Sequence, residues 1–135
     1  MSLRPKTVFT LLAVLVAATV LRAGNITDNL AEEMMQLEPG ETISTLVMMA
    51  EQYPALEQDQ VMRNAGVPLA ERHQLVLNTL KDMSESAQSD LRQQLAVRTD
   101  DGAVANWHPF FIANMIAVEA LPEVIRELAQ RDDIG

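Results

Sequence analysis

The stretch after Pro68 carries a single narrow apolar stripe at helical spacing, and this feature constrains the fold most. The stripe consists of Leu69, Val76, Leu80, Met83, Ala87, Leu91 and Leu95. Charged side chains occupy the opposite face, and Asp100-Asp101-Gly102 offers a turn at the end. The pattern predicts one long helix from Pro68 to about Arg98 that lies along another element of the fold.

Three further segments have the character of β-strands: residues 42–50, 104–112 and 115–120. In the first segment, successive side chains point to opposite faces, and both faces carry apolar residues. This pattern is typical of a strand whose two faces are both covered. Pro109 would remove one backbone donor from the second, which predicts an edge strand or a bulge there. Asn114 lies between the second and third strands and tolerates a positive φ, so a tight turn is expected at that point.

Two shorter segments separate these elements. Residues 25–41 predict a short helix, which Thr27 or Asp28 can cap and which Pro39-Gly40 ends. Residues 51–67 are polar and irregular, and they predict a loop with at most one helical turn.

With a final helix that begins at Pro122, the order is strand, long helix, strand, strand, helix. This order predicts that residues 42–135 form an α+β domain of the ferredoxin-like, split βαβ kind, an antiparallel sheet with two helices on one face. A fourth strand is expected from Ile134 onward but is missing at the C-terminus. We expect one core cluster of Leu80, Met83, Leu91, Ile116, Val118, Val124 and Leu128. The other face of the sheet would be bare and apolar, which usually indicates a partner.

Composition excludes several classes of site and partner. The chain has no cysteine and only two histidines, which excludes disulfides, thiolate nucleophiles and three-histidine metal centres. A formal net charge of −9 argues against nucleic-acid binding, which needs a clustered basic face. No acid, base and nucleophile can be assembled into a catalytic set. We therefore expect no enzyme activity, no metal and no cofactor.

Residues 1–24 predict a signal peptide. Arg4 and Lys6 precede an uncharged apolar run from Val8 to Val20, which is too short to span a bilayer comfortably. An uncleaved short anchor is the alternative. The protein is thus expected to be secreted or periplasmic, with no stable membrane insertion after cleavage of the signal peptide.

Two segments near the C-terminus carry a resemblance to a known family. Residues 110–118 read Phe-Phe-Ile-Ala-Asn-Met-Ile-Ala-Val, and residues 121–134 read Leu-Pro-Glu-Val-Ile-Arg-Glu-Leu-Ala-Gln-Arg-Asp-Asp-Ile. Together with the strand and long helix upstream, they resemble the propeptide of subtilisin-like serine peptidases over roughly residues 40–134. Propeptides of this family are ferredoxin-like, assist the folding of the attached protease and then inhibit it. The resemblance implies an inhibitor and intramolecular chaperone whose partner is a subtilisin-like protease, in cis or in trans.

The resemblance also implies where the protease would be contacted. In the family the sheet packs on helices at the protease surface, so the bare face would be the contact surface. The candidate contact residues are Trp107, Phe111, Asn114 and Glu119. Strand alternation predicts that Trp107 and Phe111 point outward as an anchor while Phe110 packs inward, and a bulge at Pro109 would invert this assignment. Glu119 could cap the N-terminus of a protease helix, or it could simply be solvated.

The sequence departs from the family because it holds no protease motif. We expect either a stand-alone prodomain-type protein or a fragment of a longer precursor. Without a fourth strand the edge of the first strand would be unpaired, which predicts weak inhibition and either a marginally stable fold or self-association through that edge. The alternative function is an exported periplasmic or extracellular interaction or chaperone module unrelated to proteases.

Overall fold

The computed structural model describes residues 24–135. The segment predicted as a signal peptide or anchor, residues 1–24, therefore lies outside the described residues except for Gly24. The elements in chain order are α1 (Asp28–Gln36), β1 (Ile43–Met48), α2 (Ala55–Asn64), α3 (Leu69–Asp100), β2 (Val104–Phe110), β3 (Met115–Ala120) and α4 (Pro122–Leu128). The predicted strands, the long helix and the first and last helices are confirmed, although β2 ends at Phe110 rather than Ile112.

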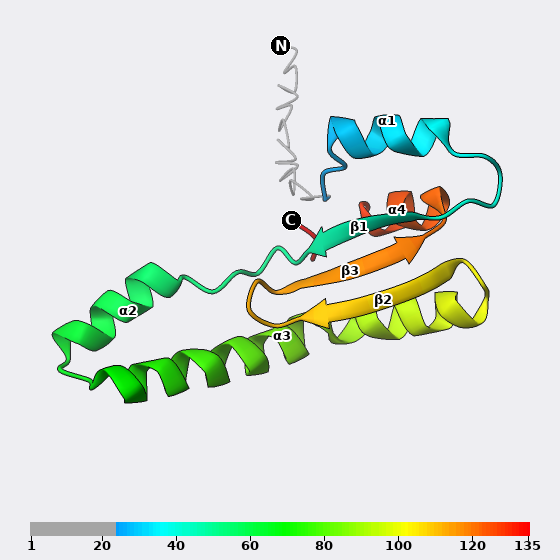
Figure 1. Ribbon diagram of the computed structural model, residues 1–135. Coiled ribbons are helices and arrows are strands. Elements are labelled where there is room, and N and C mark those ends of the chain that lie inside the picture. The colour runs from blue at the N-terminus through cyan, green and yellow to red at the C-terminus, as the bar shows by residue number, and fades with distance from the viewer. Residues whose placement is uncertain (1–23) are drawn as a thin grey trace, which may run out of the picture.

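The strands form one antiparallel sheet in the order β1-β3-β2, with β3 in the middle. Figure 1 shows α3 and α4 on one side of this sheet. Over the described residues the fold is α+β, with an open three-stranded sheet and four helices. β2 is an edge strand, as Pro109 predicts, since a missing N–H is tolerated there. The register shift in β2 lies between Val104 and Asn106 rather than at Pro109.

The core lies between the sheet and the helices. Five of the predicted core residues belong to it: Leu91, Ile116, Val118, Val124 and Leu128. Leu80 is buried but outside this cluster, and Met83 is only half-buried, so the prediction is wrong for these two. Ile43, Val47 and Ile134 join the core from β1 and the chain end, and Met34 joins it from α1.

The apolar stripe of α3 is exposed at its start and becomes buried only from Leu80 onward. Leu91 is fully buried, whereas Leu69 at the other end of the stripe is 58% exposed. Between them Leu80, Ser84 and Gln88 are buried, whereas Met83 is only half-buried. From Leu80 to Leu95 the predicted stripe and the buried positions both advance 15 residues in four steps, and they differ only in where the single step of three residues falls. The first half of α3 extends beyond the sheet (Figure 1).

Residues 51–67 contain the helix α2, so the prediction of a loop with at most one helical turn is wrong. No residue of α2 is buried, and for that reason no apolar stripe marks it in the sequence. Its attachment is polar, because Arg72 of α3 pairs with Asp59 at 2.5 Å between Nη1 and Oδ1. We refer to residues 55–79 as the α2–α3 hairpin, which projects past the end of the sheet (Figure 1).

Three predictions from local sequence signals, two at helix starts and one at a turn, are confirmed. Thr27 is the N-cap of α1, and its Oγ1 accepts a hydrogen bond from the N–H of Leu30 at 3.4 Å. Pro122 stands in the first turn of α4. Asn114 adopts a φ of 41° in the turn between β2 and β3, a conformation that asparagine tolerates better than most residues.

The end of the chain pairs with part of the outer edge of β1. Ile134 forms an antiparallel bridge with Met49. The N–H of Gly135 donates to the carbonyl of Met48 at 2.9 Å, and the N–H of Ala50 donates to the carbonyl of Asp133 at 2.8 Å. The expectation of an unpaired edge on the first strand therefore fails at its C-terminal end, where these three residues lie beside it.

Candidate functional site

The face of the sheet opposite α3 and α4 is the strongest candidate for a functional site. The strand register assigns nine residues to it: Ser44, Leu46 and Met48 from β1, Met115, Ala117 and Glu119 from β3, and Asn106, His108 and Phe110 from β2. We refer to this set as the open face. The alternate residues of β3, Ile116, Val118 and Ala120, are buried under the helices. No helix of residues 24–135 covers the open face (Figure 1).

One end of the open face is apolar and exposed. Leu46 is 59% exposed, Met48 47% and Phe110 39%. Met115 lies directly opposite Met48 on one side and opposite Phe110 on the other, so these side chains are neighbours across all three strands. A group of large apolar side chains on an exposed sheet face indicates an interaction surface.

His108 lies at the centre of the open face. Its ring packs edge-on against Phe110, with ring centroids 4.8 Å apart and an interplanar angle of 71°. Across the sheet it lies opposite Ala117, which in turn lies opposite Leu46. The small side chain of Ala117 leaves the middle of the face low, between the bulkier residues of the two edge strands.

The other end of the open face is polar and centres on Glu119. This residue lies between Ser44 on β1 and Asn106 on β2. Its Oε1 accepts a hydrogen bond from Oγ1 of Thr42 at 3.1 Å. Within residues 24–135 no cationic side chain pairs with the carboxylate. The carboxylate therefore takes part in no ion pair within these residues.

The structure reverses the predicted orientation of the aromatic residues in β2. Trp107 lies opposite Val118 and packs against the core, so it points toward the helices. Phe110 lies opposite Met115 and points away from the helices. The prediction that Trp107 points outward and Phe110 inward is therefore wrong. Alternation predicts that Phe111 shares a face with Trp107, but Phe111 belongs to the turn after β2, where strand alternation no longer applies.

Phe111 and Asn114 do not lie on the open face either. Phe111 is half-buried, with Nζ of Lys81 5.6 Å from its ring centroid. Asn114 is fully buried. Its Oδ1 accepts a hydrogen bond from Nε2 of Gln88 at 2.9 Å, and its Nδ2 donates to the carbonyl of Glu51 at 2.7 Å. Asn114 thus ties the β2–β3 turn to α3 and to the segment after β1, so Glu119 alone of the four predicted contact residues lies on the open face.

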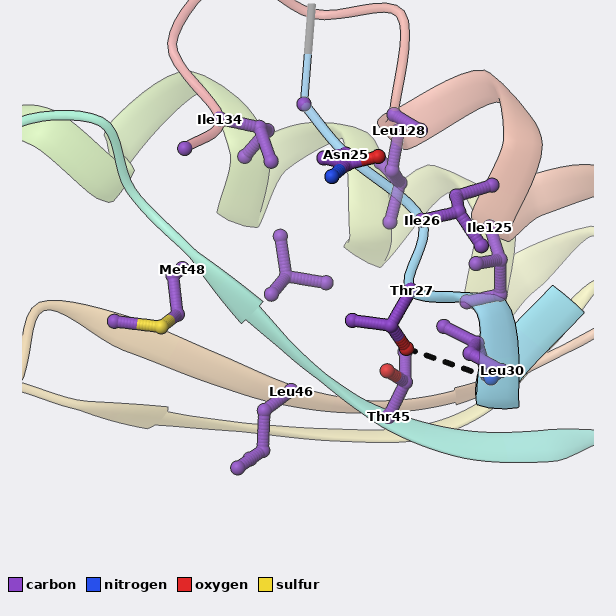
Figure 2. Close-up of a pocket in the computed structure, with 14 residues that line it drawn as sticks. Asn25, Ile26, Thr27, Leu30, Thr45, Leu46, Met48, Ile125, Leu128 and Ile134 are labelled. Atoms are coloured by element: carbon purple, nitrogen blue, oxygen red, sulfur yellow. Dashed lines mark hydrogen bonds between the residues drawn. The ribbon is translucent and has the colours of Figure 1, made fainter.

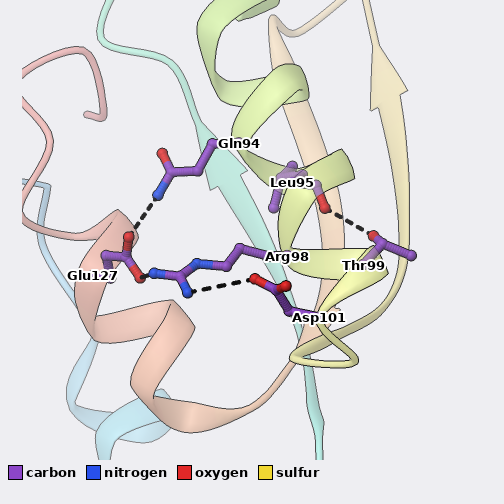
Figure 3. A network of polar contacts seen from close by, with 6 residues as sticks. All are labelled: Gln94, Leu95, Arg98, Thr99, Asp101 and Glu127. Atoms are coloured by element: carbon purple, nitrogen blue, oxygen red, sulfur yellow. Dashed lines mark hydrogen bonds and ion pairs between the residues drawn. The ribbon is translucent and has the colours of Figure 1, made fainter.

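The helix side carries polar pairs that fasten α4. Figure 3 shows Glu127 accepting hydrogen bonds from Arg98 at 2.6 Å and from Gln94 at 2.9 Å. The hydrogen bond to Glu127 raises the pKa of the Arg98 guanidinium. Arg131 pairs with Asp133 at 2.6 Å, and this hydrogen bond lowers the pKa of the Asp133 carboxyl. These charged groups are hydrogen-bonded to one another, so their role is to stabilise the packing of α4 and the chain end.

Other kinds of site find little support in the part of the chain that the structure describes. It contains no group of three His, Asp or Glu side chains placed to hold a metal ion. None of its helices is both long enough and apolar enough to cross a membrane. Comparisons with protein-family models, with curated proteins and with solved structures find no match. The geometry of the open face is therefore the main basis for a functional proposal.

Sequence reasoning did not assign the large apolar members Leu46, Met48 and Phe110 to the open face, whereas its interpretation of His108 as a strand residue that faces solvent is confirmed. A signal was present, because residues 42–50 alternate with apolar side chains on both faces and α3 and α4 can cover only one of them. The register of β2 against β3 was the missing information.

Proposed function

We propose that the chain is an exported, prodomain-like module that assists the folding of a subtilisin-like serine protease and inhibits it. The observation that carries the proposal is the open face, which is apolar and exposed at one end and carries the Glu119 carboxylate, without an ion pair, at the other. The resemblance of residues 110–118 and 121–134 to subtilase propeptides supplies the class of partner. A signal peptide in residues 1–24 would bring the module to the secreted or periplasmic space, where such a protease acts.

The arrangement of elements supports a ferredoxin-like fold for this module. β1, α3, β2, β3 and α4 follow in the order of a split βαβ unit. The bridge between Ile134 and Met49 lies on the outer edge of β1, where the fourth strand of that fold would begin.

The apolar end and the polar end of the open face could each contribute to binding the same partner surface. Leu46, Met48 and Phe110 offer apolar area that a partner surface would remove from water. Glu119 offers a carboxylate that can accept hydrogen bonds from the free N–H groups at the start of a partner helix. A helix pair laid across the sheet would meet both features at once.

A second candidate function is that of an exported interaction or chaperone module unrelated to proteases. The α2–α3 hairpin favours it, because this projection is not required by a split βαβ fold. Leu56 is 90% exposed and Val61 57% exposed on α2. In that case the hairpin would be the contact surface in place of the open face.

Inhibition of a purified subtilisin-type protease tests the first candidate. The 135-residue chain should inhibit hydrolysis of a chromogenic peptide in a dose-dependent way and raise the yield of active protease on refolding from denaturant. Phe110→Lys should weaken inhibition at least about 30-fold, since loss of a central interface anchor costs about 2 kcal/mol or more. Glu119→Gln should weaken it up to about fivefold, the scale of one charge at a helix terminus.

Leu56→Lys is the matched control, because it makes the same type of change on the α2–α3 hairpin. It should leave inhibition unchanged, and circular dichroism should show that every variant keeps the helical content of the parent chain. Loss of activity in Leu56→Lys but not in Phe110→Lys would favour the second candidate. Absence of both inhibition and refolding assistance would contradict the first.

A further inference from the structure

The outer edge of β1 carries backbone groups that face away from the sheet. The N–H of Met49 donates to the carbonyl of Asn114 on the β3 side at 3.0 Å. Successive residues of a strand direct their hydrogen-bonding groups to opposite edges, so Ser44, Leu46 and Met48 direct theirs away from β3. Gly135 uses the carbonyl of Met48. Within residues 24–135 the N–H and carbonyl groups of Leu46 and Ser44 have no strand beside them.

A groove of about 210 Å³ follows this edge (Figure 2). One side of it is β1 from Thr45 to Met48. The facing side is mainly apolar, with Ile26, Leu30, Ile125, Leu128 and Ile134. The space is several times the roughly 30 Å³ that one water occupies in the liquid. The groove thus combines a strand edge with an apolar wall.

The last residues of the chain show what kind of group this groove accepts. Residues 133–135 lie antiparallel to β1, and the side chain of Ile134 is buried next to the core. If a strand continued in this register, its side chains opposite Val47 and Thr45 would point to the same side as Ile134, into the groove. The side chain opposite Leu46 would extend the open face.

We infer that the outer edge of β1 is a binding site for an extended segment of a partner polypeptide, which adds to the sheet as an antiparallel strand. Main-chain hydrogen bonds to Leu46 and Ser44 would hold the segment, and two apolar side chains, opposite Val47 and Thr45, would fill the groove. Residues 24–27 border the groove beside β1, which suits one extended chain better than the edge of a second folded copy (Figure 2). The inference does not depend on a protease partner.

A short synthetic peptide with valine at alternate positions and threonine or lysine between them is the probe. Its length is about six residues, a typical strand, and its lysines complement the net charge of −9 of the chain. Titrated into the ¹⁵N-labelled 135-residue chain, it should bind saturably and shift the amide signals of residues 44–48. The same peptide, N-methylated at the amide that would donate to Leu46, should bind about tenfold more weakly.

Leu30→Lys places a charge in the groove and should abolish peptide binding. Leu77→Lys, on an exposed part of α3, is the matched control and should bind as the parent does. If Leu30→Lys unfolds the chain, the comparison of the unmodified and the N-methylated peptide still tests the inference, because both are titrated into the unchanged protein. The inference is overturned by absence of saturable binding, or by equal binding of the N-methylated peptide. It is also overturned by concentration-dependent shifts at residues 44–48 without peptide, which would assign the edge to a second copy.

Discussion

The two halves of α3 both carry apolar residues on a helical stripe, but their surroundings differ. In the second half, Leu91 and Leu95 are fully buried against the sheet. In the first half, Leu75 and Leu77 are 45% and 41% exposed, and the neighbouring helix α2 has no buried residue. Apolar content does not account for the burial, since the more exposed first half contains four leucines and the packed second half only two. What separates them is whether a sheet lies opposite.

This comparison shows that an apolar stripe predicts a helix more securely than it predicts burial. The stripe is set by local sequence, whereas burial needs a second surface of matching length. The strands of this sheet span six or seven residues each, while α3 has 32 residues. A helix rises about 1.5 Å per residue and a strand about 3.3 Å, so the helix is roughly twice as long as the sheet it covers.

The largest expected effect contrasts one leucine from each half. Leu91→Ala should lower the free energy of unfolding by about 2–5 kcal/mol, because it leaves a cavity in the core. Leu75→Ala should change it by less than about 0.5 kcal/mol, as is usual for an exposed site. Urea unfolding followed by circular dichroism measures both. Equal losses would show that the hairpin belongs to the same cooperative core.

An intermediate effect is expected at Asn114, which joins the packed half of α3 to the sheet. Asn114→Ala removes the partners of Gln88 and of the Glu51 carbonyl, so it should cost about 1–3 kcal/mol. Asn114→Gly makes the same deletion but accepts the positive φ, so it should cost less than the alanine variant. Urea unfolding gives both values. A glycine variant as stable as the parent would mean that the hydrogen bonds contribute nothing.

The smallest effect on global stability is expected at Asp59, which holds α2 to the free half of α3. Asp59→Asn weakens the pair with Arg72 and should change the unfolding free energy by less than about 1 kcal/mol, because the pair is partly exposed. Amide hydrogen exchange in α2 should nevertheless become faster. Glu57→Gln, an exposed acid of the same helix, is the control. Unchanged exchange in α2 would show that this ion pair does not hold the hairpin.

Sequence reasoning succeeded where the signal is local. The capping threonine at position 27, the turn at Asn114 and the proline that opens α4 each act within a few residues. It failed at α2, a helix that has no buried side chain and that pairs with α3 through the contact between Asp59 and Arg72. It also failed for the orientation of Trp107, which depends on pairing with a strand that follows later in the chain. For the candidate site, the existence of a bare sheet face was predictable, but most of its residues were not.

The sheet order also fixes the order of events during synthesis. The central strand β3 is the last of the three strands to be made, and it brings Ile43 opposite Ala120. Until then β1 is an unpaired apolar strand, while α3 can already form from contacts along its own backbone. An unpaired apolar strand is a template for aggregation. We therefore expect the nascent chain to be most prone to aggregation in the interval between the synthesis of β1 and that of β3.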